Sequence, residues 1–273
     1  MSLRDDRMKQ LILFFVVVFA GTFGMVALLL GAPGLFGEVT LTNPLVVLGV
    51  YFPSLTSIAL TAILEGRAGL GRLLKRINPL GFNPVWYLVV LLGLPLVIAL
   101  GVLVTGGRPS FVGLGAALTA AGVALLLDPG PIGEEFGWRG YALPRLLERF
   151  SPFTATLILG VIWATWHLPA FFMPGMPQSE LNLGIFYLGA ITASMVMTWV
   201  ALNTAGSILL AILIHLMLNH GGDAVGASFN QTTMGTLIAS IAIWAFVRKR
   251  FFLAPGLSAP SPAARGAAPP PPA

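Results

Sequence analysis

Long apolar blocks run through this chain, and they restrict its fold more than any other feature. The blocks are about 18–23 residues long, and a helix of about 20 apolar residues crosses the ~30 Å hydrocarbon core of a bilayer. Of the 273 residues, 56% are hydrophobic and only 9% are charged, which leaves no room for a separate soluble domain. The sequence therefore predicts an all-α, polytopic transmembrane helical bundle.

The apolar blocks predict about eight membrane spans. They cover residues 9–31, 44–64, 84–106, 111–127, 153–173, 183–202, 206–220 and 231–247. Residues 132–150 predict a further helix, amphipathic and partly embedded. The first block is longer than the ~7–15 apolar residues of a signal peptide, so we interpret it as an uncleaved span. Residues 254–273 are rich in Pro and Ala and predict a disordered tail after a membrane domain of residues 1–253.

Basic residues alternate between the loops and predict the orientation in the membrane. One set of loops and ends carries Arg4, Arg7, Lys9, Arg67, Arg72, Lys75, Arg76, Arg139, Arg145, Arg149, Arg248, Lys249 and Arg250. The other set carries Glu38, Arg108, Glu180 and Asp223. Because Lys and Arg favour the cytoplasmic side, we expect a multi-pass protein of the cell membrane with both termini in the cytoplasm.

The net charge of +5 fits contact with anionic lipid headgroups of the bilayer, because the basic residues lie at the ends of apolar blocks. We therefore exclude nucleic acid as a partner. The chain has no cysteine, which excludes disulfides, thiolate metal sites and a cysteine nucleophile.

The stretch DPGPIGEEFGWRG, residues 128–140, places two adjacent glutamates and an arginine between apolar runs. Proline suits the first turn of a helix, so a helix should begin near Pro131. Glu135 and Arg139 are four residues apart in the order that favours an ion pair. Glu134 points about 100° away, which leaves it available for a proton. The alternative interpretation is a solvated helix start at the membrane surface.

Three histidines fall at or inside the later apolar blocks. His167 ends one block, and the alternative for it is an interfacial histidine in an aromatic belt. His215 and Asn219 are four residues apart and share a helix face, where they could simply form interhelical hydrogen bonds. His220 faces elsewhere and fits a helix-end histidine.

The combination on three helices is more informative than any single motif. A glutamate, a histidine and a His/Asn pair supply a general base, a group that orients water and two oxyanion donors. These are the groups needed to hydrolyse an amide.

The three motifs resemble those of the CAAX-protease and bacteriocin-processing family of intramembrane proteases. Glu134, Glu135 and Arg139 match its EExxxR motif, and His215 and Asn219 match its HxxxN motif. His167 matches FxxxH, although Trp163 stands where phenylalanine is usual. We interpret that departure as one of packing more than of chemistry.

The resemblance implies an intramembrane endopeptidase, with a catalytic cavity inside the bundle that opens toward the cytoplasm and a catalytic core at about residues 128–222. It implies Glu134 as base, His167 as its water-orienting partner, and His215 with Asn219 as the oxyanion site, acting on a protein or peptide substrate at the membrane. Family members have often been called metalloproteases, and two histidines with a glutamate could bind zinc. We favour a metal-free mechanism, because no HExxH motif is present.

Two other classes compete with the protease. A transporter also uses broken helices and buried charge, but the first half of this chain lacks buried charge. A non-proteolytic protein on the same fold, acting in bacteriocin immunity or as a scaffold, is the second alternative. Intact motifs favour the protease over both.

Overall fold

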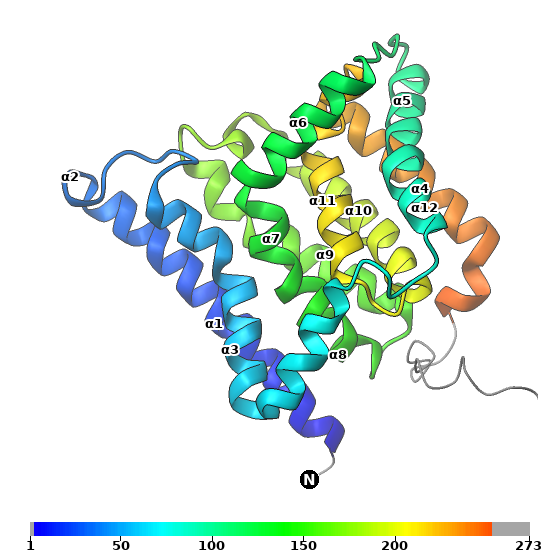
Figure 1. Cartoon of the computed structure of the whole chain (residues 1–273). Helices are drawn as coiled ribbons and strands as arrows, with labels where there is room; N and C mark the ends of the chain where they lie inside the picture. The colour runs from blue at the N-terminus through cyan, green and yellow to red at the C-terminus, as the bar shows by residue number, and fades with distance from the viewer. Residues whose placement is uncertain (1–2, 253–273) are drawn as a thin grey trace, which may run out of the picture.

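The computed structural model describes residues 3–252, which form a bundle of helices (Figure 1). Side chains at residues 3, 4, 114, 118 and 247–252 are not described, and the predicted tail 254–273 lies outside the described residues. The principal helices are α1 (Leu3–Gly31), α3 (Pro44–Leu74), α4 (Val85–Leu88), α5 (Leu94–Val104), α6 (Leu114–Leu127), α7 (Pro129–Glu135), α8 (Leu143–Leu147), α9 (Pro152–Trp166), α10 (Leu183–Asn203), α11 (Ile208–His220) and α12 (Phe229–Phe252). The predicted all-α polytopic bundle is confirmed.

Short segments connect or extend these helices. They are α2 (Pro33–Phe36), the π-helical segments η2 (Val89–Gly93) and η3 (Phe136–Ala142), and the 3₁₀ segments η1 (Lys75–Ile77), η4 (Leu168–Phe172), η5 (Pro177–Glu180) and η6 (Asp223–Val225). The segment η3 joins α7 to α8, so that α7, η3 and α8 form one continuous helical stretch.

Every predicted span coincides with a helix, but the helices differ in their ability to cross a membrane. Among the described residues, five helical segments are individually long and apolar enough. A sixth candidate is the pair Gly115–Leu127 and Pro129–Leu147, bent by 57°. Helix α11 is only 13 residues long. At about 1.5 Å per residue it is too short to cross the hydrocarbon core by itself.

Polar caps followed by proline explain where several helices begin. In three helices the capping residue comes directly before a proline and accepts a hydrogen bond from a backbone N–H further along the helix. The caps are Asn43, which accepts from Leu45 N, Asp128, which accepts from Gly130 N, and Ser151, which accepts from Thr154 N. Proline has no N–H to satisfy in a first turn, and the capping oxygen satisfies another donor. Such starts suit an apolar environment, where unsatisfied backbone donors are costly.

The helices pack as two groups, which meet at α11 and also where α8 and η3 contact α9. Helix α1 packs on α3, and α3 packs on α7 and η3. In the second group α9 packs on α10, α10 on α12, and α12 on α5. Helix α11 contacts both α7 and α10, and lies centrally in Figure 1.

The helical stretch from Pro129 to Leu147 corrects one expectation. We predicted a partly embedded amphipathic helix over 132–150. In the structure its side chains from Gly133 to Leu146 are almost all buried inside the protein. Near its end, Arg145 pairs with Glu65 of α3 at 2.7 Å.

Reporter fusions test the predicted orientation. A fusion after Leu80, in the loop that follows the basic end of α3, is expected to read as cytoplasmic, and so is a fusion at residue 265. A matched fusion after Gly107, at the other end of α5, is expected to read as external. An external reading at residue 265 would contradict the topology.

Candidate active site

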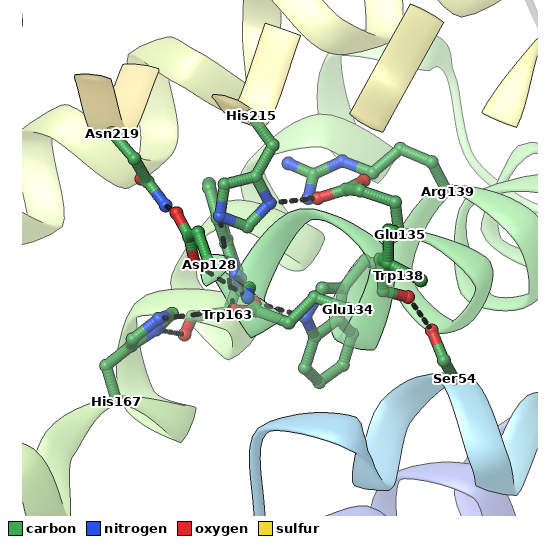
Figure 2. Close-up of polar contacts among 12 residues, drawn as sticks. Ser54, Asp128, Glu134, Glu135, Trp138, Arg139, Trp163, His167, His215 and Asn219 are labelled. Atoms are coloured by element: carbon green, nitrogen blue, oxygen red, sulfur yellow. Dashed lines mark hydrogen bonds and ion pairs between the residues drawn. The ribbon is translucent and has the colours of Figure 1, made fainter. Parts of the chain in front are cut away.

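The site forms where α7, α9 and α11 meet (Figure 2). Helix α7 supplies Glu134 and Glu135, the end of α9 supplies His167, and α11 supplies His215 and Asn219. The structure thus brings together residues that are separated by up to 85 positions in the sequence. Arg139 joins them from η3.

Glu135 and Arg139 form the predicted ion pair deep in the protein. Arg139 Nη1 donates to Glu135 Oε1 at 3.0 Å, and their side chains are 1% and 0% exposed. Arg139 also donates to Ser194 Oγ at 3.1 Å, and Ser194 lies on α10. Arg139 therefore links η3 to α10 through Ser194, and to the end of α7 through Glu135.

His215 shares the same carboxylate. Its Nδ1 lies 2.7 Å from Glu135 Oε1, and the imidazole is buried. A carboxylate paired with arginine can only accept a hydrogen bond, so Nδ1 carries the proton. The other ring nitrogen, Nε2, then points toward Glu134, whose Oε1 is 4.0 Å away.

His167 approaches Glu134 from the opposite helix in an analogous way. Its Nδ1 lies 2.8 Å from the backbone carbonyl of Trp163, which can only accept, so Nδ1 again carries the proton. Its Nε2 is 3.9 Å from Glu134 Oε1. Both Nε2 atoms are too far for a direct hydrogen bond, and close enough for one water to contact Oε1 and a ring nitrogen together.

The two oxygens of Glu134 have different environments. Trp163 Nε1 donates to Oε2 at 2.6 Å and Trp138 Nε1 donates to the same oxygen at 3.1 Å. Among the described residues, no side chain donates a hydrogen bond to Oε1. The sequence led us to expect that Trp163 would change packing more than chemistry. The structure contradicts this, because the indole of Trp163 contacts the carboxylate directly.

Asn219 lies at the accessible edge of the cluster. Its Nδ2 donates to Asp128 Oδ2 at 2.9 Å. A Cβ atom placed on Gly130 would lie 3.5 Å from both Asn219 Nδ2 and Glu134 Oε1, so these two atoms are at most 7.0 Å apart. Glycine at position 130 therefore keeps open the space between the amide and the carboxylate.

Asp128 is a site residue to which the sequence analysis gave no role. Besides Asn219, it accepts from His220 Nε2 at 2.8 Å and caps α7 through Gly130 N at 2.8 Å. One carboxylate therefore ties the start of the Glu-bearing helix to the end of the His/Asn-bearing helix. The signal in the sequence was the Asp-Pro pair, which predicts a capped helix start.

A second missed feature is the spacing of Gly133 and Gly137 around the two glutamates. A Cβ on Gly133 would lie 2.9 Å from Val50 O, and one on Gly137 would lie 2.7 Å from the backbone of Pro53. The stretch GEEFG is thus a G-x-x-x-G pattern that brings α7 and η3 against the backbone of α3. Ser54 Oγ adds a hydrogen bond to Ile132 O at 2.8 Å, drawn in Figure 2. This close contact directs the glutamates toward α9 and α11.

Arg76 supports the π-helical segment that follows the glutamates. It donates to the carbonyls of Gly140, Arg139 and Gly206 at 2.6, 2.8 and 2.6 Å. A π-helical segment departs from the regular i to i−4 hydrogen-bond pattern, so external donors can satisfy its carbonyls. The sequence analysis counted Arg76 only as a topology signal.

The side chains do not form a metal site as they stand. Within residues 3–252 no group of three His, Asp or Glu side chains is placed to hold a metal ion. Glu134, His167 and His215 are the most similar set to zinc ligands, and Glu134 Oε1 lies 3.9 Å from His167 Nε2 and 4.0 Å from His215 Nε2. Two tetrahedral ligands of one zinc ion are about 3.4 Å apart, so these atoms would have to move closer by about 0.5 Å to bind zinc in that geometry.

The fold and this cluster define the class of protein: a polytopic helical membrane protein with a buried Glu/His/His site completed by an asparagine. Comparison with known proteins also indicates a membrane protease of this kind. Residues 116–221 match the model of the family described as type II CAAX prenyl endopeptidase Rce1-like. The matched residues include all three motifs that resemble the CAAX-protease and bacteriocin-processing family.

The similarity to a curated relative covers part of each protein. CAAX prenyl protease 2 of Methanococcus maripaludis is 32% identical over 128 residues, which is 44% of this chain and 47% of that protein. The aligned part thus spans about half the length of the curated relative.

Proposed function

We propose that the protein is an intramembrane endopeptidase of the CAAX-protease type, in which Glu134 and His167 activate a water molecule. The observation that carries the proposal is the pair of acceptors, Glu134 Oε1 and His167 Nε2, 3.9 Å apart on different helices. A water between them donates one hydrogen to each acceptor. Its lone pairs are then directed away from both groups, toward a substrate carbonyl.

In this mechanism Glu134 Oε1 takes the proton as the water oxygen attacks the carbonyl carbon. The negative charge moves to the carbonyl oxygen, where Asn219 and His215 supply hydrogen bonds. Glu134 then returns the proton to the departing amine, and the peptide bond breaks. Water is consumed: its oxygen and one hydrogen become part of the new carboxylic acid, and its other hydrogen goes to the amine.

The oxyanion role of His215 requires a proton on Nε2 in addition to the one on Nδ1. The second proton gives His215 a positive charge, and the adjacent carboxylate of Glu135 stabilises that charge inside the protein. With Glu134 and Glu135 ionised, the charges of Arg139 and a doubly protonated His215 make the cluster neutral. Charges buried in pairs avoid most of the cost of an isolated charge in an apolar environment.

The substrate is a protein or peptide at the membrane, and its CAAX character follows from the family resemblance. The test is cleavage of a labelled peptide ending in a CAAX sequence, in prenylated and unmodified forms, by the purified full-length protein in liposomes. The wild type is expected to cleave, and Glu134→Gln is expected not to. Equal absence of cleavage in both would favour a non-proteolytic role on the same fold, and cleavage by both would contradict Glu134 as base.

Chelation tests whether the mechanism is metal-free. We expect activity to be unchanged after treatment with a chelator and dialysis, because the proposed water is activated by Glu134 rather than by a Lewis acid. The measurement is activity with and without the chelator, together with the zinc content of the purified protein. Stoichiometric zinc that is lost along with activity, and that restores activity on return, would overturn the metal-free mechanism.

A further inference from the structure

We propose that Trp163 and Trp138 act as positioning residues that hold Glu134 by its Oε2 atom and so select Oε1 as the oxygen that takes the proton. The inference rests on the proposed role of Glu134 as base. It assigns a chemical function to Trp163, the position at which this chain departs from the FxxxH motif.

The first argument is the donor chemistry of the two indoles. An indole N–H can donate but cannot accept, so neither Trp138 nor Trp163 can take a proton from Glu134 or from water. With both donors on Oε2, at 3.1 and 2.6 Å, that oxygen is occupied. Rotation of the carboxylate would break two buried hydrogen bonds, and each such bond to a charged group is among the stronger ones in proteins.

The second argument is the position of Trp163 among the other site residues. Its carbonyl accepts from His167 Nδ1, its ring lies edge-on to the ring of His215 at 5.4 Å, and the guanidinium of Arg139 lies 4.4 Å from its ring centroid. Trp163 therefore contacts Glu134, Arg139, His167 and His215, which lie on three helices and a π-helical segment. Phenylalanine at this position would keep an aromatic ring and the carbonyl but not the N–H donor.

Trp138 is fixed independently of Trp163. It is fully buried, and its ring packs edge-on against Phe14 of α1 and Trp166 of α9, with centroids 5.8 Å away in each case. The two donors thus reach Oε2 from η3 and from α9. Their convergence on one oxygen is a property of the assembled bundle, not of either helix alone.

The kinetic test replaces each indole by a ring that cannot donate. Trp163→Phe is expected to lower kcat about 10- to 100-fold with KM nearly unchanged, because the lost hydrogen bond orients the base and does not contact substrate. Trp166→Phe is the matched control. Trp166 lies on α9 like Trp163, and its buried indole donates instead to Thr22 Oγ1 of α1 at 3.0 Å. Its replacement is expected to leave kcat near that of the wild type. Equal kcat in wild type and Trp163→Phe would overturn the inference.

A spectroscopic test needs no activity and separates this inference from the proposed function. In protein labelled with ¹⁵N at the tryptophan indoles, the Trp163 and Trp138 N–H resonances are expected to shift in Glu134→Gln, while that of Trp166 stays in place. Unshifted Trp163 and Trp138 resonances would overturn the hydrogen bonds to Glu134. If the resonances shift but Glu134→Gln still cleaves peptide, the hydrogen bonds to Glu134 are correct and Glu134 is not the base. The positioning role of the two tryptophans would then be refuted as well.

Discussion

Glu134→Ala is expected to abolish peptide cleavage almost completely, whereas Asn219→Ala should leave a small measurable activity. The reason is the division of work in the proposed mechanism. Loss of one oxyanion donor costs about 10²–10³ in rate, because His215 remains as the second donor. Loss of Glu134 removes the acceptor for the proton of the attacking water, and the described site offers no other carboxylate oxygen facing both imidazoles.

The measurement is the initial rate of peptide cleavage for both variants at matched protein concentration. Glu148→Ala is the control, since Glu148 is an acidic residue near the same helical stretch that pairs with Arg7 at the surface, with side chains 36% and 45% exposed. Its rate should equal that of the wild type. A Glu134→Ala variant more active than Asn219→Ala would contradict the assignment of the base.

Arg139→Met is expected to destabilise the protein by about 3–5 kcal/mol as well as to lower its activity, because it leaves Glu135 buried with its arginine removed. The pair lies at 0–1% exposure, so water cannot compensate for the lost charge. His215 would remain as a partner of Glu135, and Ser194 would lose its contact with the guanidinium. Thermal unfolding in detergent measures the loss.

Arg7→Met provides the matched comparison for stability. It breaks an ion pair of similar length, 3.1 Å, between groups that water already reaches. Exposed pairs contribute about 0–1 kcal/mol, so its unfolding temperature should stay close to that of the wild type. Equal unfolding temperatures for Arg139→Met and Arg7→Met would show that the buried pair does not stabilise the helix.

The helices could be predicted from the sequence because hydropathy is a local property. The second span, for example, was predicted to end at residue 64, and the backbone of α3 leaves helical geometry at Gly66, where φ is 63°. A helix start near Pro131 was also predicted, and α7 begins at Pro129. The burial of this helix inside the protein was not predicted, because the same Pro-rich stretch fits either a surface loop or a bent helix inside the bundle.

The Glu135–Arg139 ion pair was predicted because its geometry depends on one helix. Side-chain contacts that depend on tertiary structure were missed or misjudged. No local pattern indicates that the indole of Trp163 reaches Glu134, or that Asp128 reaches Asn219 and His220 across about 90 residues. The Gly133/Gly137 spacing is different, since it is visible in the sequence and indicates close helix packing.

The close contact between α3 and the Glu-bearing helix also restricts the direction from which a peptide can reach Glu134. An extended chain needs about 4.8 Å between itself and a neighbouring backbone. Gly133 and Gly137 bring the two helices so near that a single added methyl group would overlap Val50 or Pro53. A peptide therefore has to approach Glu134 from another side. The side at Asn219 is accessible, because Asn219 is exposed and the neighbouring Asp128 is partly exposed. Two glycines with no role in proton transfer thus exclude one route to the site for any substrate.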